Sequence, residues 1–201
     1  MNQNKHSATV WIVDDDPSLL RMLQTLVSTL DAQVKAFATA RDFLDAYLPT
    51  EKSCLICDLR MPDIDGLELQ KRLKADRAPL PIIFLTGFAE VSVAVEAMRD
   101  GALDFLQKPF SAHALLGKIQ SALELGELQY EQWQQAQTKQ ARIDLLTPKE
   151  RAIARLVVDA KSSREISQFL DLSVRTIENH RIRIMEKLHV DSTIDLVKLF
   201  L

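Results

Sequence analysis

Three aspartates that follow apolar, strand-like runs are the residues best suited to chemistry. Asp14 and Asp15 come directly after the first run, and Asp58 follows the third. Asp16 precedes Pro17 and is explained as the N-cap of a helix, which leaves Asp14 and Asp15 without a structural role. Converging carboxylates repel one another unless a hard divalent cation lies among them, and oxygen-only ligands favour Mg²⁺. We therefore expect a magnesium site.

Two further residues are suited to bind an anion at that metal. Thr86 ends the fourth apolar run, and Lys108 follows the fifth. A lysine and a hydroxyl on the same rim favour phosphate as the ligand. Because a carboxylate is a weak nucleophile, Mg²⁺ and Lys108 must neutralise the incoming phosphoryl oxygens. The set predicts metal-assisted phosphate chemistry.

These residues are carried by alternating strand-like runs and amphipathic stretches. The predicted strands are Ala8–Val13, Gln33–Phe37, Ser53–Cys57, Pro81–Leu85 and Leu103–Leu106, and helices are expected near 16–30, 39–48, 65–76 and 90–101, with another from Ser111. Five βα units of this kind imply a parallel sheet covered by helices on both faces. Ligands bind such sheets in the crevice at the carboxyl ends of the strands, where the acidic residues fall.

The helix that begins at Ser111 is predicted to continue as one long helix to about Arg142. The stretch 128–142 is rich in Gln and contains no Pro, and Gln is a good helix former. A frayed polar linker is the alternative. We expect a first domain over 1–125, a helical linker over 126–144 and a second domain over 145–201.

The second domain is predicted to contain four short helices. Capping boxes begin at Thr147 and Ser162, Ser173 begins a third helix, and Asp191 begins a fourth. Because the middle two helices are joined by a tight turn, they predict a helix-turn-helix. The fold class is therefore an α/β five-stranded parallel (βα)₅ domain, followed by a small all-α four-helix domain and joined to it by a long helix.

The charge of the 201-residue chain is unevenly distributed. The net charge is −3, but residues 145–201 carry +2 and residues 1–144 carry −5. A mildly basic second domain is compatible with nucleic-acid binding. No apolar run approaches the roughly 18 residues of a membrane span, and residues 1–9 lack the core of a signal peptide. We expect a cytoplasmic protein with no membrane partner.

Cys54 and Cys57 form a C-x-x-C spacing, which raises a redox or zinc interpretation. Both residues fall in a predicted buried strand, where residues three apart point to opposite faces. No second Cys/His pair completes a zinc site. We interpret the two thiols as small core residues.

The acidic constellation resembles the receiver domain of two-component response regulators. The resemblance covers roughly residues 8–125 and rests on Asp14/Asp15, Asp58, Thr86 and Lys108-Pro109 at successive strand ends. It implies that Asp58 accepts the phosphoryl group, and that Mg²⁺ is held by Asp15 and Asp58, by Asp14 through water, and by the backbone carbonyl of Arg60. It also implies a phosphate-pairing Lys108, a switching Thr86, an aromatic switch at Phe105 and a cis Lys108-Pro109 bond.

Residues 146–188 resemble the LuxR-type helix-turn-helix of the NarL/FixJ response regulators. The matching segments are Leu146-Thr147-Pro148-Lys149-Glu150-Arg151, Arg164-Glu165-Ile166, Val174–Arg181 and Met185–Leu188. One departure is Ala160-Lys161-Ser162-Ser163, where the family usually has Gly and Asn. Since Ser162 is also a good helix cap, the fold is expected to persist.

The third helix of this domain is predicted to read DNA. Helical spacing assigns Val174, Ile177, Ile184 and Leu188 to a buried stripe. On the other side, an exposed Ile182 is expected to meet a thymine methyl, Asn179 an adenine and Glu178 a cytosine. The residues expected at phosphates are Arg175, His180, Arg181, Arg183 and Lys187, with Thr176 flanking this surface.

Together these features predict a non-enzymatic response regulator. A sensor histidine kinase is expected to phosphorylate Asp58 and so control sequence-specific binding to double-stranded DNA, and thereby transcription by the RNA polymerase machinery. A homodimer is expected on phosphorylation or on DNA. Its candidate surfaces are a receiver face at Val91, Val95, Met98 and Phe105 and a last-helix face at Val197 and Phe200.

Three other functions stay open from the sequence. The acidic site could belong to an aspartyl-phosphate phosphatase. The second domain could belong to a ligand-sensing LuxR-type regulator, which needs a small-molecule domain where this chain has carboxylates. A receiver could also act through protein contacts alone, with a helix-turn-helix that no longer binds DNA.

Overall fold

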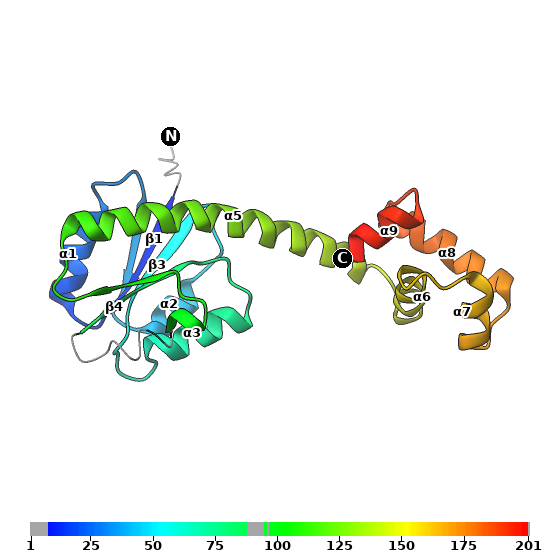
Figure 1. Cartoon of the computed structure of the whole chain (residues 1–201), viewed down its shortest axis with the longest axis horizontal. Helices are drawn as coiled ribbons and strands as arrows, with labels where there is room; N and C mark the ends of the chain where they lie inside the picture. The colour runs from blue at the N-terminus through cyan, green and yellow to red at the C-terminus, as the bar shows by residue number, and fades with distance from the viewer. Residues whose placement is uncertain (1–7, 88–94, 96, 201) are drawn as a thin grey trace. The chain divides into compact units, whose positions relative to one another are not determined.

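The computed structural model describes residues 8–87, 95 and 97–200. The chain divides into two compact units, the first ending at Trp133 and the second beginning at Gln134. Figure 1 shows the α/β architecture of the first unit and the helical architecture of the second. The first unit contains two clusters of buried hydrophobic residues, and the second unit contains one of its own.

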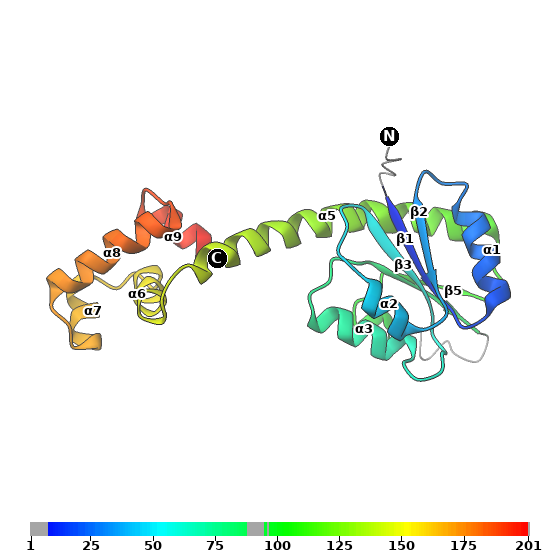
Figure 2. The same cartoon turned by 180° about the vertical axis from the view of Figure 1, so that it is seen from behind.

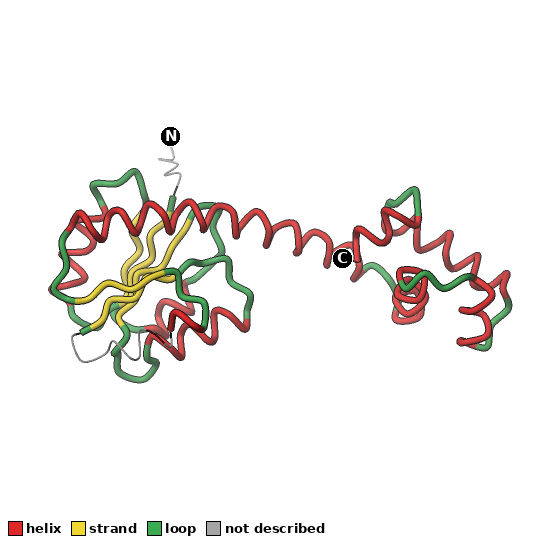
Figure 3. The backbone as a smooth tube through the Cα atoms, in the orientation of Figure 1, coloured by secondary structure: helices red, strands yellow, loops and turns green. Residues whose placement is uncertain are grey.

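The first unit contains the predicted parallel sheet. Among the described residues its strands are β1 (Thr9–Val13), β2 (Gln33–Phe37), β3 (Ser53–Asp58), β4 (Ile82–Thr86) and β5 (Asp104–Gln107). They pair in the order β2-β1-β3-β4-β5, with every pair parallel. Figure 3 shows the strands in yellow between helices. The five-stranded (βα)₅ prediction is confirmed.

Helices cover both faces of this sheet. One face carries α1 (Pro17–Val27) and the first part of α5, and the other carries α2 (Ala40–Ala46) and α3 (Gly66–Ala75) (Figure 2). Of the helix expected near 90–101, residues 95 and 97–99 are helical, and residues 90–94 and 96 lie outside the described residues. Asp16 caps α1 by accepting the Ser18 N–H at 2.7 Å, as predicted.

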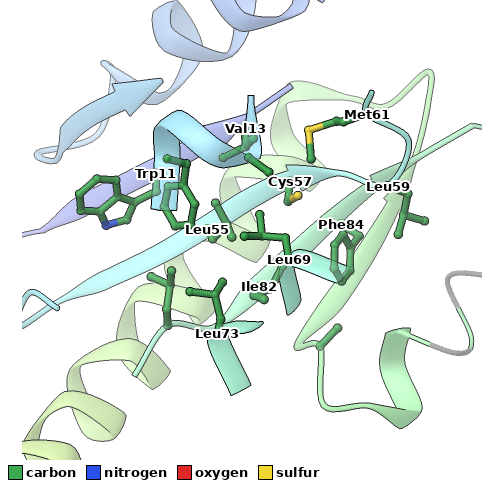
Figure 4. Close-up of a cluster of buried hydrophobic side chains, with 14 of the residues drawn as sticks. Trp11, Val13, Leu55, Cys57, Leu59, Met61, Leu69, Leu73, Ile82 and Phe84 are labelled. Carbon is green, nitrogen blue, oxygen red and sulfur yellow. The ribbon is translucent and has the colours of Figure 1, made fainter. Parts of the chain in front are cut away.

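Alternation along the strands separates two cores. Trp11, Leu55 and Cys57 belong to the core beneath α2 and α3, which Figure 4 shows in close-up. Cys54 belongs to the core beneath α1 and α5. Both cysteines are free, fully buried and on opposite faces of β3, and burial raises the pKa of each thiol. The interpretation as core residues is confirmed.

The long helix α5 runs from Ala112 to Asp144. The prediction of one continuous helix is confirmed, and the frayed linker is not observed. Gly126 lies where α5 crosses the start of β3, and a Cβ at this position would lie 2.0 Å from the Ser53 carbonyl oxygen. Glycine is required there because the two backbones approach so closely.

The second unit contains α6 (Pro148–Val158), α7 (Ser163–Leu170), α8 (Val174–Leu188) and α9 (Thr193–Phe200). The capping boxes Thr147/Glu150 and Ser162/Glu165 both form, and Ser173 caps α8. The prediction that Asp191 begins the last helix was wrong. Ser192 accepts the Asp195 N–H at 3.1 Å, so the hydroxyl one position later takes the cap.

Candidate functional site

The acidic residues meet at the carboxyl ends of the strands of the first unit. Asp14 follows β1 and is 1% exposed, and Asp58 ends β3 and is 7% exposed. Asp15 follows β1 as well but is exposed. Because β1 pairs with β3 in register Val13↔Cys57, residues 14 and 58 leave the sheet side by side. The parallel topology therefore brings together residues 44 positions apart.

Lys108 joins the two buried carboxylates. Its Nζ lies 2.6 Å from Asp58 Oδ1 and 3.1 Å from Asp14 Oδ2. It follows β5, and the Lys108-Pro109 peptide bond is cis, as expected. The arrangement places one positive charge between two negative ones at the strand ends.

Burial and charge oppose each other at Asp58. Desolvation raises the pKa of Asp58, while the hydrogen bond and charge of Lys108 lower it, and Asp14 raises it further; the net direction is upward. For Lys108, burial lowers the pKa, but Asp58 and Asp14 more than compensate and raise it. The lysine is therefore held as a cation beside the carboxylates.

Backbone N–H groups orient the remaining carboxylate oxygens. Asp58 Oδ2 accepts the Arg60 N–H at 3.2 Å, and Asp14 Oδ1 accepts the Asp16 N–H at 2.9 Å. The Cys57 thiol donates to the Asp58 carbonyl oxygen at 3.1 Å. Both carboxylates are thus fixed with one oxygen toward Lys108.

The donor set suits a hard divalent cation. The described residues hold no ready-made cluster of three His, Cys, Asp or Glu ligands. However, Asp14 and Asp58 both form an ion pair with Lys108, and both would supply carboxylate oxygens as metal ligands. Asp15 is next to Asp14 in the chain, and Arg60 is two residues from Asp58. These groups fit an oxygen-coordinated Mg²⁺ with water completing its shell.

The other receiver-like residues lie on neighbouring strands. Thr86 ends β4 and is fully buried, with its hydroxyl 3.2 Å from the Gly87 carbonyl oxygen. Phe105 lies on β5 opposite Phe84 and packs, half-buried, against the core beneath α2 and α3. Both residues therefore lie on strands that lead to the acidic site.

The exposed side of α8 matches most of the predicted pattern. Ile177, Ile184 and Leu188 are buried, whereas Ile182 is 58% exposed. The prediction that Val174 is buried was wrong, since it is 40% exposed at the first position of the helix. A residue in the first turn has no preceding turn to cover it.

The predicted DNA contacts differ in exposure. Arg175, Glu178, Asn179 and Arg183 are exposed, and Thr176, His180 and Arg181 are half-buried. Thr176 donates its N–H to the Ser173 cap at 3.1 Å. Arg181 Nη1 lies 3.4 Å from Ser163 Oγ, which places its guanidinium at the N-terminus of α7. A helix N-terminus and an arginine side by side favour an anion.

Lys187 has a structural partner that the sequence did not reveal. Its Nζ lies 2.7 Å from Glu150 Oε2, and Glu150 is buried. The same oxygen accepts the N–H and the hydroxyl of Thr147, each at 2.9 Å. Lys187 and the Thr147 backbone lower the pKa of Glu150 to about 2. A capping glutamate was expected from the sequence, but its second partner lies 37 residues away.

Comparison with known proteins matches each unit to a known protein family. A family model described as "Response regulator receiver domain" matches residues 10–120, and one described as "Bacterial regulatory proteins, luxR family" matches residues 144–200. The transcriptional regulatory protein FixJ of Bradyrhizobium diazoefficiens is 38% identical over 190 residues, covering 94% of this chain and 93% of its own. TdiR of Thauera aromatica is 37% identical over 195 residues, covering 96% and 85%.

Two solved structures match most of this chain, across both units. The response regulator StyR superposes with a TM-score of 0.68 at 34% identity, covering 96% of this chain and 98% of its own. Full-length FixJ from B. japonicum superposes with a TM-score of 0.58 at 38% identity, covering 95% and 94%.

A receiver domain followed by a LuxR-type DNA-binding domain defines a two-component response regulator that controls transcription. This chain belongs to the NarL/FixJ family of response regulators. A histidine kinase and DNA are the partners that these two domains imply. Within the described residues no helix is long and apolar enough to cross a membrane.

Proposed function

We propose that a sensor histidine kinase phosphorylates Asp58 and that the phosphorylated protein binds its promoter DNA more tightly. The observation that carries this proposal is the placement of Lys108 Nζ 2.6 Å from Asp58 Oδ1 and 3.1 Å from Asp14 Oδ2. Asp58 and Asp14 are both held at strand ends with Lys108 against one oxygen and an N–H against the other, but Asp58 makes the shorter contact with Lys108 and is the less buried of the two. Phosphoryl transfer needs both a fixed nucleophile and nearby positive charge.

The chemistry assigns a part to each residue. An Asp58 carboxylate oxygen attacks phosphorus, the bond to the donor's imidazole nitrogen breaks, and that nitrogen keeps the electron pair. Lys108 moves from Asp58 to the incoming phosphoryl oxygens. Asp14, Asp15, Asp58 and the Arg60 carbonyl would hold Mg²⁺, which supplies further neutralisation of these oxygens when bound. The activity is regulatory, since the phosphoryl group stays on the protein.

Thr86 and Phe105 are proposed to report the modification. Phosphorylation adds about two negative charges and new acceptor oxygens at the end of β3. The Thr86 hydroxyl, which points to Gly87 in this structure, can donate to those oxygens. Its movement vacates space along β4 and β5, so that Phe105 can turn inward.

Labelling with a small phosphodonor tests the acceptor directly. With Mg²⁺, the protein is expected to gain one acid-stable, base-labile phosphate. Asp58→Asn abolishes the label, and Asp15→Asn abolishes it by removing a metal ligand. Asp16→Asn is the matched control, because Asn also caps α1. Wild-type labelling in Asp58→Asn contradicts the assignment, and so does an equal loss in Asp16→Asn.

The DNA-reading surface is proposed to be the exposed side of α8. Ile182, Asn179 and Glu178 are proposed to face base edges. Phosphates are proposed to meet Arg175, His180, Arg181 and Arg183, with Thr176 flanking this surface. Lys187 belongs to the predicted set as well, but its pairing with Glu150 favours a structural part. The proximity of Arg181 to the start of α7 supports a phosphate there.

A homodimer is proposed to form on phosphorylation or on DNA. One domain of net charge +2 makes few phosphate contacts, so pairing two recognition helices strengthens binding. On the receiver face Val95 and Met98 are exposed, while Val91 lies outside the described residues. On α9, Val197 and Phe200 are half-buried, and Phe200 packs on the core, so exposed Ile194 replaces it in the proposed surface.

Sedimentation with and without phosphodonor tests the dimer, with Asp58→Asn as the control. The mass is expected to rise only in the phosphorylated wild type. A mass that stays monomeric while specific DNA binding rises contradicts dimerisation as the switch. Contact with the RNA polymerase machinery is proposed to follow DNA binding, and transcription from a cognate promoter in a purified system tests it.

A further inference from the structure

The last turn of α5 carries an arginine that reaches the end of another helix. Arg142 Nη2 donates to the carbonyl oxygen of Leu188 and, at 3.2 Å, to that of His189. Leu188 is the last residue of α8, and His189 is its C-cap in the left-handed conformation, with φ 47°. The guanidinium therefore lies at the C-terminus of the helix that carries the proposed DNA contacts.

The C-terminus of α8 needs such a donor. The last carbonyls of a helix have no intrahelical partners. The turn at His189 supplies two N–H groups: His189 donates to Glu186 at 3.2 Å and Val190 to Met185 at 3.1 Å. The carbonyls of Leu188 and His189 receive theirs from Arg142. A cation is also favourable at this end of the helix dipole.

A second arginine also binds the end of α5. Arg151 of α6 donates through Nη2 to the Ile143 carbonyl oxygen at 3.3 Å and to Asp144 Oδ1 at 2.8 Å. Ile143 packs against the core of the second unit, and Leu146 is buried in it. The end of α5 is therefore part of the same body as α6 and α8.

We propose that Arg142 is a positioning residue for DNA binding, which fixes α8 to the last turn of α5. A movement of this turn is then transmitted to α8 and is not absorbed by a flexible joint. Arg142 acts through the α8 carbonyls and does not touch DNA. Arginine suits this part, since the two N–H groups of Nη2 can serve two carbonyls and the guanidinium retains its charge when half-buried.

Distance measurements in the full-length protein test, without reference to DNA, whether Arg142 fixes α8 to the last turn of α5; we call this contact the Arg142 joint. Spin labels are placed at Gln137→Cys on α5 and Glu186→Cys on α8, both exposed positions. The native Cys54 and Cys57 are fully buried and will not compete for the label. Pulsed electron paramagnetic resonance is expected to give one narrow distance distribution, which broadens in Arg142→Ala and narrows again in Arg142→Lys.

Promoter affinity gives the functional readout. Loss of a charge-assisted hydrogen bond predicts about tenfold weaker binding in Arg142→Ala, with partial recovery in Arg142→Lys. Arg155→Ala removes the same charge from an exposed position of α6 and is expected to change neither readout. Circular dichroism establishes that each variant is folded.

Each outcome decides the proposal. An unchanged distance distribution in folded Arg142→Ala contradicts the proposal that Arg142 fixes α8 to α5, whatever happens to DNA binding. A broadened distribution with unchanged promoter affinity overturns the positioning part. Equal affinity losses in Arg142→Ala and Arg155→Ala assign the effect to charge alone and also overturn it. If α8 is not the DNA-reading helix, Ile182→Ser will leave the affinity for DNA unchanged. This result would contradict DNA reading by α8 and would leave the proposed contact of Arg142 to be judged by the distance measurement alone.

Discussion

Replacing Glu150 by Gln is expected to destabilise the DNA-binding unit in a pH-dependent way. Gln keeps an acceptor for the Thr147 cap but removes the negative charge that pairs with Lys187. The pKa of about 2, against an ordinary 4.5, corresponds to at most about 3 kcal/mol of interaction with the ionised carboxylate. Because the Lys187 side chain is 40% exposed, solvent screening reduces this to about 1–2 kcal/mol.

The pH window follows from the direction of the shift. The pKa of Glu150 is lower in the folded state, so its contribution is fully present above about pH 4.5. It is lost as the pH falls from there toward 2, where the folded carboxylate also becomes protonated. The difference in unfolding free energy between wild type and Glu150→Gln is therefore expected at pH 7 and should shrink toward zero near pH 2.

Hydrogen exchange of α6 and α8 peptides, recorded across a urea titration, measures the free energy of unfolding of this unit within the full-length protein. Glu165→Gln is the matched control, since Glu165 closes the equivalent capping box on α7 but is exposed. Its replacement should lower the free energy of unfolding less than Glu150→Gln does. An equal destabilisation of Glu150→Gln at pH 7 and pH 3, or none at either, refutes the reasoning.

The same pairing predicts that Lys187→Met leaves the salt dependence of DNA binding unchanged. Loss of a phosphate contact would instead lower the slope of the logarithm of affinity against the logarithm of salt concentration by about 0.9.

Three other changes give distinct expectations. Chelation of divalent cations is expected to abolish labelling of the protein by a small phosphodonor, and added Mg²⁺ should restore it; labelling that persists in chelator contradicts the metal site. Gly126→Ala is expected to destabilise the receiver unit by about 1–3 kcal/mol, because its Cβ would lie 2.0 Å from the Ser53 carbonyl oxygen, as thermal unfolding will show. Ile182→Ser is expected to weaken specific DNA binding by about 1 kcal/mol without changing stability. Leu145→Ser, at the same exposure, should leave the affinity in the same titration unchanged.

Much of the fold could be predicted because local signals agree with the tertiary structure. The alternation of runs gave five parallel strands, and Asp16-Pro17 marked the start of α1 correctly. The acidic site could be located because parallel strands bring their carboxyl ends to one edge, so that Asp14 and Asp58 must meet there.

What the sequence could not show depends on contacts between distant residues or on competition between near neighbours. The Lys187–Glu150 and Arg142–Leu188 contacts join residues 37 and 46 positions apart, and no periodic pattern encodes them. Ser192 and Asp191 are both good caps and are adjacent in the chain, and the structure places the Ser192 hydroxyl at the Asp195 N–H. Val174 fits the spacing of a buried stripe but lies at a helix end, where no neighbouring turn covers it.

Promoter binding with and without phosphorylation tests the central claim most directly. Wild type, Asp58→Asn and Asp16→Asn are each titrated onto promoter DNA at one fixed salt concentration, with Mg²⁺ and with or without a small phosphodonor. The phosphodonor is expected to tighten specific binding of wild type and Asp16→Asn and to leave Asp58→Asn unchanged. An equal gain in Asp58→Asn, or no gain in wild type that carries the phosphate, contradicts control of DNA binding through Asp58.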